Sequence, residues 1–290
     1  MKFALHVIPP PKAARMALYE SVTAGAAKCG DEVYIVNNYN GVPEGDGTII
    51  YGIAGQAARI IFDQYLAAGK HVLFFDKGYT RVDALKRSMV RVAIDSFQPL
   101  AYLDKIARPL DRLRLTGVVA EPYYKLPKGD SILFDGATNK YCQWYGLGNQ
   151  VDWGTSIIER IRQHTDRIVI YRLRPDHNPT PVIYDVHTSL CPLQEDLSRA
   201  HVVVSHGGNL GWDAVVAGRP HFAIDISIAR PMSETRWSHL DTPYVPVNGA
   251  RQQWMANVCY CQWTFDELAN GTGWRIIRQQ LEMSKANRGM

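Results

Sequence analysis

The chain has 290 residues, a mass of 32.6 kDa and a formal net charge of +4 at neutral pH. Its 46% hydrophobic and 21% charged residues are typical of a globular protein, and the lack of any apolar run of about 18 residues argues against a membrane span. The mild positive charge permits an anionic partner, but no block of Lys and Arg marks a dedicated nucleic-acid-binding arm.

The cysteines and the N-terminal residues provide evidence about the cellular compartment of the protein. Five cysteines are present, an odd number, and no two of them have Cys-x-x-Cys spacing. The sequence therefore predicts neither a disulfide scaffold nor a zinc site. The apolar stretch at 1–8 is too short before the prolines at 9–11 to be the core of a signal peptide. We expect a cytoplasmic protein with no metal ion and no membrane partner.

In the first half, apolar runs alternate with stretches of helical spacing, and glycines separate them. The expected elements are a strand at 2–8, a helix at 13–29, strands at 32–36 and 48–53, a helix at 56–68 and a strand at 71–75. This order predicts a parallel α/β sheet, whose ligands bind beyond the carboxyl ends of the strands. The residues expected at that edge are His6, Gly52, Gly55, Gln56, Asp76 and Lys77.

One further strand is expected at 90–94, followed by Asp95. Glycines and prolines cluster at 116–128, where we place a domain boundary. The second half repeats the alternation of the first. Its expected elements are strands at 131–134 and 167–171, helices at 153–164 and 192–200, and terminal helices at 254–263 and 266–283.

The most informative stretch is 201–225, HVVVSHGGNLGWDAVVAGRPHFAID. Its apolar run breaks at Ser205-His206-Gly207-Gly208-Asn209, and a short helix and a second apolar run follow. This pattern predicts a strand-turn-helix-turn-strand unit of a parallel sheet. Two adjacent glycines allow positive φ and a close approach to a ligand, and the start of a helix directs free N–H groups at an anion. A phosphate is the expected occupant, and a tight turn with nothing bound is the alternative.

The segment LSRAHVVVSHGGNLGWDAVVAGRPHFAI resembles the donor-site signature of GT-B glycosyltransferases. There a strand enters a small polar turn, an acidic residue lies in the next helix, and a Gly-Arg-Pro element leads to the following strand. Together with ISIARPMSET and RQQWMANVCYCQWT, the segment is similar to bacteriophage glycosyltransferases, some of them associated with DNA hypermodification. Two features depart from the family pattern: the acidic helix residue is Asp213 instead of Glu, and Leu173-Arg174 replaces a common Lys.

The resemblance implies two doubly wound, Rossmann-like α/β domains with C-terminal helices. Residues 1–120 would form the acceptor-side domain, 121–265 the nucleotide-sugar domain, and 266–290 a helix that packs back towards the first domain. The implied activity is metal-independent transfer of a sugar from a nucleotide sugar, a UDP-sugar by the resemblance, to an acceptor hydroxyl. The acceptor would be 5-hydroxymethylpyrimidine in phage DNA, in the host cytoplasm.

The donor-site candidates follow from the same resemblance. Residues Ser205, His206, Gly207, Gly208 and Asn209 would cradle the diphosphate. Arginine and lysine at strand exits suit phosphate oxygens, and carboxylates or hydroxyls suit ribose and sugar hydroxyls. The further candidates are Arg172, Arg174 and Lys140 for phosphate, Asp213 for the turn or a ribose, and Asp225, Ser233 and Glu234 for the sugar. The alternatives are that Arg172 and Arg174 are ordinary solvated residues at a strand end, and that Asp213 is a carboxylate on the surface of a helix.

An inverting transfer needs a base that takes the proton of the acceptor hydroxyl. The resemblance puts this base in the first half, where His6, Asp76 and Asp95 are the candidates. Retaining enzymes share the fold, so this assignment holds only for inversion. The loop aromatics Tyr123, Tyr124, Trp144 and Tyr145 are candidates for acceptor binding.

Two other functions remain open at this point. A sugar-nucleotide epimerase of the same architecture would release a free sugar nucleotide and need no polymer acceptor. A non-catalytic nucleotide- or glycan-binding protein would keep the binding site and lack the base. A sugar transfer that requires DNA would distinguish the glycosyltransferase hypothesis from both of these alternatives.

Overall fold

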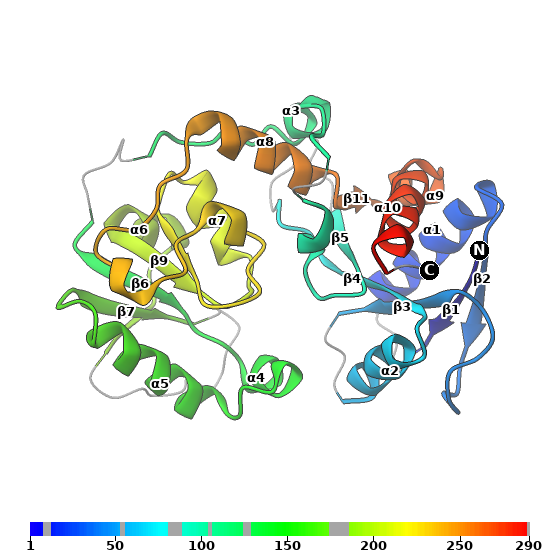
Figure 1. Ribbon diagram of the computed structural model, residues 1–290, viewed down its shortest axis with the longest axis horizontal. Helices are drawn as coiled ribbons and strands as arrows, with labels where there is room; N and C mark the ends of the chain where they lie inside the picture. Colours follow the sequence, from blue (N-terminus) through cyan, green and yellow to red (C-terminus); the bar gives the residue numbers. More distant parts are fainter. Residues whose placement is uncertain are drawn as a thin grey trace. The chain divides into compact units, whose positions relative to one another are not determined.

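The computed structural model describes residues 1–7, 13–52, 56–80, 89–103, 106–123, 129–173 and 186–288 (Figure 1). The chain forms two compact units. The first comprises Met1–Val118 and Met255–Met290, and the second comprises Val119–Trp254. Each unit contains one sheet with helices, so the fold class is α/β with two Rossmann-like units.

The sheet of the first unit has six strands in the order β11-β5-β4-β3-β1-β2. They are β1 (Lys2–His6), β2 (Glu32–Val36), β3 (Gly47–Tyr51), β4 (His71–Lys77), β5 (Met89–Ile94) and β11 (Gln262–Thr264). The first four are mutually parallel, as their apolar runs and the helices between them predict. The helices of this unit include α1 (Ala13–Lys28), α2 (Gln56–Ala67), α3 (Asp111–Thr116) and the short 3-10 helix η1 (Pro99–Tyr102).

Two strands depart from the predicted parallel sheet. Strand β5 runs antiparallel to β4, and β11 runs antiparallel to β5. The prediction of a helix over 254–263 is wrong in its second half, because α8 (Asn248–Cys259) ends before the strand Gln262–Thr264. The side-chain oxygen of Gln262 accepts a hydrogen bond from the Tyr79 N–H at 3.0 Å, and this buried contact holds the segment against the first sheet.

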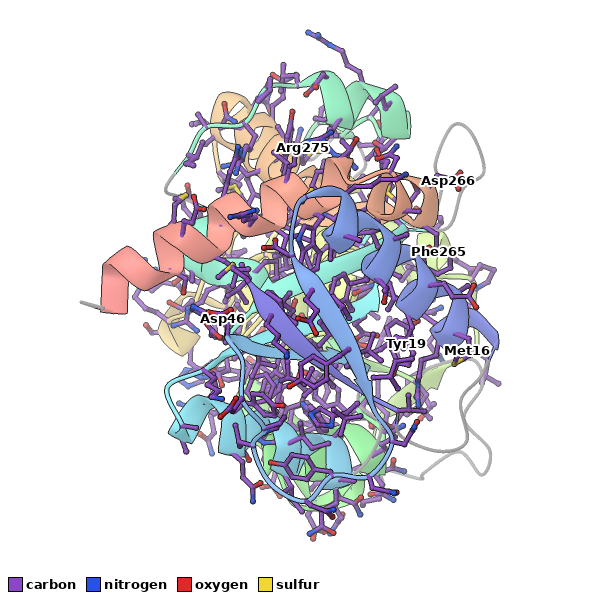
Figure 2. All side chains as sticks on the ribbon, turned by 90° about the vertical axis from the view of Figure 1, so that its right-hand side faces the viewer. Met16, Tyr19, Asp46, Phe265, Asp266 and Arg275 are labelled. Atoms are coloured by element: carbon purple, nitrogen blue, oxygen red, sulfur yellow. The ribbon has the colours of Figure 1, made fainter. Side chains whose placement is uncertain are left out.

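The last two helices, α9 (Phe265–Ala269) and α10 (Thr272–Arg288), pack on α1. A Cβ atom on Gly25 of α1 would lie 1.9 Å from the carbonyl oxygen of Leu268, so only glycine allows this approach. The indole of Trp274 donates a hydrogen bond to the buried carboxylate of Asp31 at 2.8 Å. Figure 2 shows α1 beside the labelled residues of α9 and α10.

The sheet of the second unit has five strands, all parallel, in the order β10-β9-β6-β7-β8. They are β6 (Ser131–Asp135), β7 (Ile168–Arg172), β8 (His187–Ser189), β9 (Ala200–Ser205) and β10 (His221–Ala223). Its helices include α4 (Asn139–Tyr145), α5 (Gln150–Arg162), α6 (Leu193–Arg199) and α7 (Leu210–Val216), and two 3-10 turns, η2 (Arg230–Met232) and η3 (Trp237–His239), follow β10. Leu133, Val203 and Leu210 belong to the core between the sheet and its helices.

Helices α4 and α5 begin where the sequence provides a capping side chain. The Thr138 hydroxyl accepts a hydrogen bond from the Tyr141 N–H, and the Asn149 side chain accepts from the N–H groups of Val151 and Asp152. These caps fix the start of each helix beyond the carboxyl end of β6. Across the described ranges, no helix has both the length and the apolar composition to cross a bilayer.

Candidate functional site

The strand order of the second sheet marks a ligand site. The chain runs from β6 to β7 and β8 on one side, and then returns to place β9 and β10 on the other. Doubly wound sheets bind ligands in the crevice outside the carboxyl ends of the strands at which this reversal occurs, here β6 and β9. A pocket lies there, which we call the His206 pocket. It is lined by Asp135, Gly136, Ala137, Tyr141, Trp153, His206, Gly207 and Gly208.

Packing of the surrounding side chains explains both glycines of the turn. A Cβ atom on Gly207 would lie 2.8 Å from the Tyr141 hydroxyl oxygen, and one on Gly208 would lie 2.6 Å from Oδ2 of Asp135. The freedom of glycine to take positive φ is not used here: within the described ranges left-handed backbone occurs at other glycines, such as Gly218 (φ 66°), and not at Gly207 or Gly208. The close approach that the sequence predicted is therefore made, at least in part, to the protein's own side chains.

His206 is 5% exposed and lies in an aromatic surrounding. Its Nδ1 atom is 2.7 Å from the Tyr141 hydroxyl oxygen. The rings of Tyr141, Tyr145 and Trp153 meet the imidazole edge to face, with centroids 5.6, 5.4 and 5.9 Å away. Burial lowers the pKa of His206 below its usual value of 6.5, although the carboxylate of Asp225, 3.8 Å from Nε2, acts in the opposite direction. At neutral pH the imidazole is uncharged.

The hydroxyls of Ser205 and Ser233 are both bound to His221, a residue that sequence analysis missed. Ser205 Oγ lies 2.8 Å from Nε2 of His221, and Ser233 Oγ lies 2.6 Å from Nδ1. His221 is completely buried, and this burial lowers its pKa to about 3. The structure therefore places both serines in an internal hydrogen-bond chain beneath the site. A histidine that follows Arg-Pro in an apolar strand carries no sequence signal of this role.

The predicted phosphate-binding cations differ in their surroundings. Arg172 ends β7 and forms an ion pair with Asp196, whose side chain is 2% exposed, and its Nη1 donates to the Cys191 carbonyl at 2.8 Å. Its guanidinium thus neutralises a buried carboxylate. Lys140 lies at the start of α4 and is exposed. Arg174 lies outside the described residues, as do Gly55 and Tyr124.

The predicted acidic residues also lie in different settings. Asp213 is half-buried in α7, and its N–H donates to the Asn209 carbonyl at 3.1 Å. Asp225 follows β10 with its side chain 62% exposed. Burial alone would raise the pKa of Glu234, but hydrogen bonds from the Arg236 side chain and from the backbone N–H groups of Arg236 and Thr235 lower it to about 2. Glu234 therefore organises the turn after β10.

In the first unit, His6 and Asp76 lie at the carboxyl edge of the parallel strands, together with Gly52 and Lys77. His6 ends β1, is 3% exposed, and places Nε2 2.9 Å from the Tyr65 hydroxyl oxygen. Burial lowers its pKa to about 4. Asp76 is more accessible, with its side chain 29% exposed, and its Oδ2 lies 3.0 Å from Nη2 of Arg91.

Asp95 lies at the opposite edge of this sheet. Because β5 runs antiparallel to β4, its end lies beside the beginning of β4 at His71. The carboxylate of Asp95 lies 2.9 Å from Nδ1 of His71 and accepts the Val72 N–H at 2.8 Å. The three predicted base candidates are therefore not brought to one edge.

The aromatic residues predicted to bind the acceptor lie in different surroundings. Trp144 is 4% exposed and belongs to the core, Tyr145 lies beside His206, and Tyr123 packs under the guanidinium of Arg251 at 4.5 Å. Asp135, Tyr141 and Trp153 line the pocket and were not selected from the sequence. The position of Asp135 at a strand end was the one available signal. No group of three His, Cys, Asp or Glu side chains among the described residues is arranged to hold a metal ion.

Comparison with solved structures identifies the fold. The KpsC β-Kdo 2,7 transferase of Thermosulfurimonas dismutans is 11% identical, with a TM-score of 0.51, and the match covers 89% of this chain and 90% of that chain. The chain has a GT-B-like fold. The KpsC β-Kdo 2,4 transferase of the same organism is 10% identical over 88% and 89% of the two chains, with a TM-score of 0.45.

A candidate UDP-N-acetylglucosamine 2-epimerase of Listeria monocytogenes is 10% identical over 100% of this chain and 97% of that chain, with a TM-score of 0.27. No family model matches the chain, and no curated protein matches it in sequence. The comparisons thus establish a fold shared with glycosyltransferases.

Proposed function

We propose that this protein is a glycosyltransferase that binds a nucleotide sugar at the carboxyl edge of its second sheet. The observation that carries the proposal is the reversal of the strand order between β6 and β9, because Asp135 and the His206-Gly207-Gly208 turn lie at the carboxyl ends of these two strands. The KpsC neighbour with the higher TM-score is a sugar transferase, which supports this reaction class for the shared fold.

The finer features of the proposal come from the resemblance of the segment 197–224 to GT-B donor sites. They are a UDP-sugar as donor, transfer without a metal ion, and a 5-hydroxymethylpyrimidine of phage DNA as acceptor. Backbone N–H groups after Gly208 would supply partial positive charge to the diphosphate. A base in DNA reaches such an active site only after it leaves the stack, or in single-stranded DNA.

For an inverting reaction we propose Asp76 as the base that takes the acceptor proton. Its side chain is 29% exposed, whereas His6 is 3% exposed and bound to Tyr65. A base must reach the hydroxyl that it deprotonates, so accessibility favours Asp76. His6 remains uncharged at neutral pH and is the second choice.

The first experiment is a thermal shift assay with UDP, GDP, ADP, CMP and their common sugar conjugates. A ligand at a hundred times its dissociation constant stabilises the fold by about 2.7 kcal/mol, which is readily visible. We expect one nucleotide series to raise the melting temperature. If none does, the nucleotide-sugar proposal is wrong.

A pair of glycine variants then locates the binding site. In Gly208→Ala the new methyl group would displace the Asp135 carboxylate, which lies 2.6 Å from its position, and nucleotide binding should fall. Gly249→Ala is the matched control, because no atom lies within 4 Å of a Cβ atom there. Melting without ligand shows whether each variant is folded, and equal ligand shifts in both would place the donor elsewhere.

Transfer assays separate the enzyme classes. Sugar incorporation into hydroxymethylated DNA, with none into unmodified DNA, is the expected result for the DNA acceptor. Conversion of the sugar nucleotide without any acceptor would instead identify an epimerase. Binding without either reaction would identify a binding protein.

A further inference from the structure

We propose that β2 (Glu32–Val36) is a dimer interface, at which the β2 strands of two copies of this chain pair antiparallel and join their six-stranded sheets. β2 is the outermost strand of the first sheet and has β1 as its one neighbour there (Figure 1). The interface belongs to the first unit and does not depend on the nucleotide-sugar function.

The pairing of β2 with β1 uses the backbone of every second residue. The Glu32 N–H donates to the Met1 carbonyl at 2.8 Å, and the Val36 carbonyl accepts the Val7 N–H at 3.1 Å. In a parallel pair, the residues of a strand alternate between those that bond the neighbouring strand and those that face away from it. The residues of β2 that bond β1 are therefore Glu32, Tyr34 and Val36.

The other two residues of the strand, Val33 and Ile35, direct their N–H and C=O groups away from β1. These groups have no hydrogen-bond partner among the described residues. A row of such groups at a sheet edge is a template for another strand. Ile35 is also 57% exposed, although Leu5, its partner on β1, is completely buried. The edge thus offers both backbone hydrogen-bonding groups and an apolar side chain.

The other edge strands of the two sheets are protected in ways that β2 is not. β8, β10 and β11 have three residues each, and such short edge strands give a partner little to pair with. β10 also forms a bridge to Glu234, and β11 is buried along its whole length. β2 has five residues with no Lys or Pro among them, so it lacks the residues that commonly prevent edge strands from pairing.

The sequence of β2 is complementary to a second copy of itself. Antiparallel pairing centred on Tyr34 places Val33 of one copy opposite Ile35 of the other, so the residues with outward backbone groups meet. Each of these two pairs exchanges two main-chain hydrogen bonds and joins two β-branched side chains, a favourable cross-strand contact. Glu32 then lies opposite Val36 of the second copy, and no like charges face each other. This match about a twofold axis favours a second copy over an unrelated strand.

Contacts on the faces of the sheet hold β2 in place and leave its edge open. Helix α1 packs on β2. The Tyr34 phenol donates to the Glu44 carbonyl at 2.7 Å, and the ammonium of Lys2 lies 5.1 Å from the centre of the Tyr34 ring. The strand is therefore formed before the second copy arrives, and dimerisation carries a small cost in chain ordering.

Sedimentation velocity of the full chain tests the dimer. We expect a species of twice the chain mass of 32.6 kDa, whose share rises with concentration because the contact is small. Ile35→Lys places a charge at the edge and should sediment as a monomer over the same range. Ile60→Lys is the matched control, because Ile60 is a 44% exposed isoleucine of α2 in the same unit, and it should behave as wild type. A monomeric wild-type protein, or a dimeric Ile35→Lys, would overturn the proposal.

Proline variants test the backbone instead of the side chain. Ile35→Pro removes an N–H that faces the edge and keeps every hydrogen bond between β1 and β2, so it should abolish the dimer in a folded chain. Tyr34→Pro removes an N–H that bonds β1 and should lower the melting temperature. A folded Ile35→Pro that still dimerises would contradict pairing through the outward N–H groups. If Ile35→Pro does not fold, the comparison of Ile35→Lys with Ile60→Lys decides.

Cysteine variants test the register. In the proposed pairing the two copies of residue 34 lie opposite each other, with Cα atoms about 4.5 Å apart, which suits a disulfide. Tyr34→Cys should therefore form a covalent dimer with oxidised glutathione. Glu32→Cys is the control in the same strand, because its two copies would lie about 13 Å apart along the strands. Wild-type protein, with its five cysteines, gives the background. No covalent dimer of Tyr34→Cys, or equal amounts with both variants, would overturn the proposed pairing.

Discussion

The Nε2 atom of His221 lies 2.8 Å from the hydroxyl oxygen of Ser205, and neither side chain is exposed. Its Nδ1 atom contacts Ser233, whose hydroxyl also donates to the Ala229 carbonyl. Ser233 must then accept from Nδ1–H, which leaves Nε2 to accept from Ser205, because a neutral imidazole has one donor and one acceptor. The imidazole thus joins the end of β9, beside the His206 pocket, to the turn after β10.

Replacement of His221 should destabilise the second unit. His221→Ala leaves the buried hydroxyl of Ser205 and the half-buried hydroxyl of Ser233 without this partner and creates a cavity, so we expect a loss of about 2–4 kcal/mol in the free energy of unfolding. Urea denaturation measures this loss. His187→Ala, at an exposed position of β8, is the control and should change stability by less than about 0.5 kcal/mol. If both variants lost the same free energy of unfolding, the hydrogen bonds of His221 with Ser205 and Ser233 would contribute nothing to stability.

Stability should fall as the pH is lowered from about 6.5 to 5. Burial lowers the pKa of His6 to about 4 and that of His221 to about 3, below the value of 6.5 in the unfolded chain. The unfolded state therefore takes up protons first on acidification, and each histidine costs about 1.4 kcal/mol per pH unit in this window. Above pH 7 both contributions are constant.

Denaturation at pH 7 and pH 5 tests this dependence. Wild-type protein should lose about 2 kcal/mol per histidine between the two values, and His6→Gln should lose correspondingly less. His164→Gln, at an exposed position just after α5, should keep the wild-type dependence. A wild-type stability that is flat over this range would contradict the buried neutral state of both imidazoles.

Arg172 should matter for stability, in contrast to Lys140. Arg172→Ala leaves the carboxylate of Asp196, 2% exposed, without its counter-charge, and should cost about 3 kcal/mol in the free energy of unfolding. Arg172→Met combined with Asp196→Leu removes both charges and should recover most of this loss. Lys140→Ala, at an exposed site, should leave stability unchanged. Urea denaturation of the three variants provides the comparison. An Arg172→Ala variant as stable as the wild type would show that the buried carboxylate of Asp196 does not depend on Arg172.

The sequence predicted the strand ends of the candidate site well because apolar runs and glycines are local signals. The runs that became β6, β7, β9 and β10 were recognised, and parallel strands bring their carboxyl ends to one edge. The GT-B-like fold expected from the 197–224 segment is confirmed by the comparison with KpsC. A βαβ pattern can be recognised in the sequence because it depends only on residues that are neighbours along the chain. It therefore predicts at which edge of the sheet a site lies.

The contacts that the side chains make at that edge could not be predicted, because they involve residues that are distant in the sequence. Ser205 has the same local context whether its hydroxyl meets a phosphate or His221. Arg172 at a strand exit looks available until α6 brings Asp196 to it. The direction of β5 could not be predicted either, since a single short strand pattern fits a parallel or an antiparallel neighbour equally well.

Asp95 should act on stability and leave catalysis intact. Its φ of 59° is the one positive value at a described non-glycine residue, and its carboxylate accepts from Val72 and pairs with His71. Asp95→Ala loses these contacts and keeps the unfavourable backbone, so it should cost about 2–4 kcal/mol. Asp95→Gly loses the same contacts without the backbone penalty and should be about 1 kcal/mol more stable than Asp95→Ala.

Asp95→Asn preserves an acceptor for the Val72 N–H and tolerates positive φ, so it should be the mildest of the three variants. Urea denaturation gives the order, and an alanine variant as stable as the glycine variant would contradict the left-handed backbone. Because Asp95 lies at the edge opposite to His6 and Asp76, folded Asp95→Asn should retain sugar transfer. Asp76→Asn, at the carboxyl edge, should lose it, and the reverse pattern would return the base to Asp95.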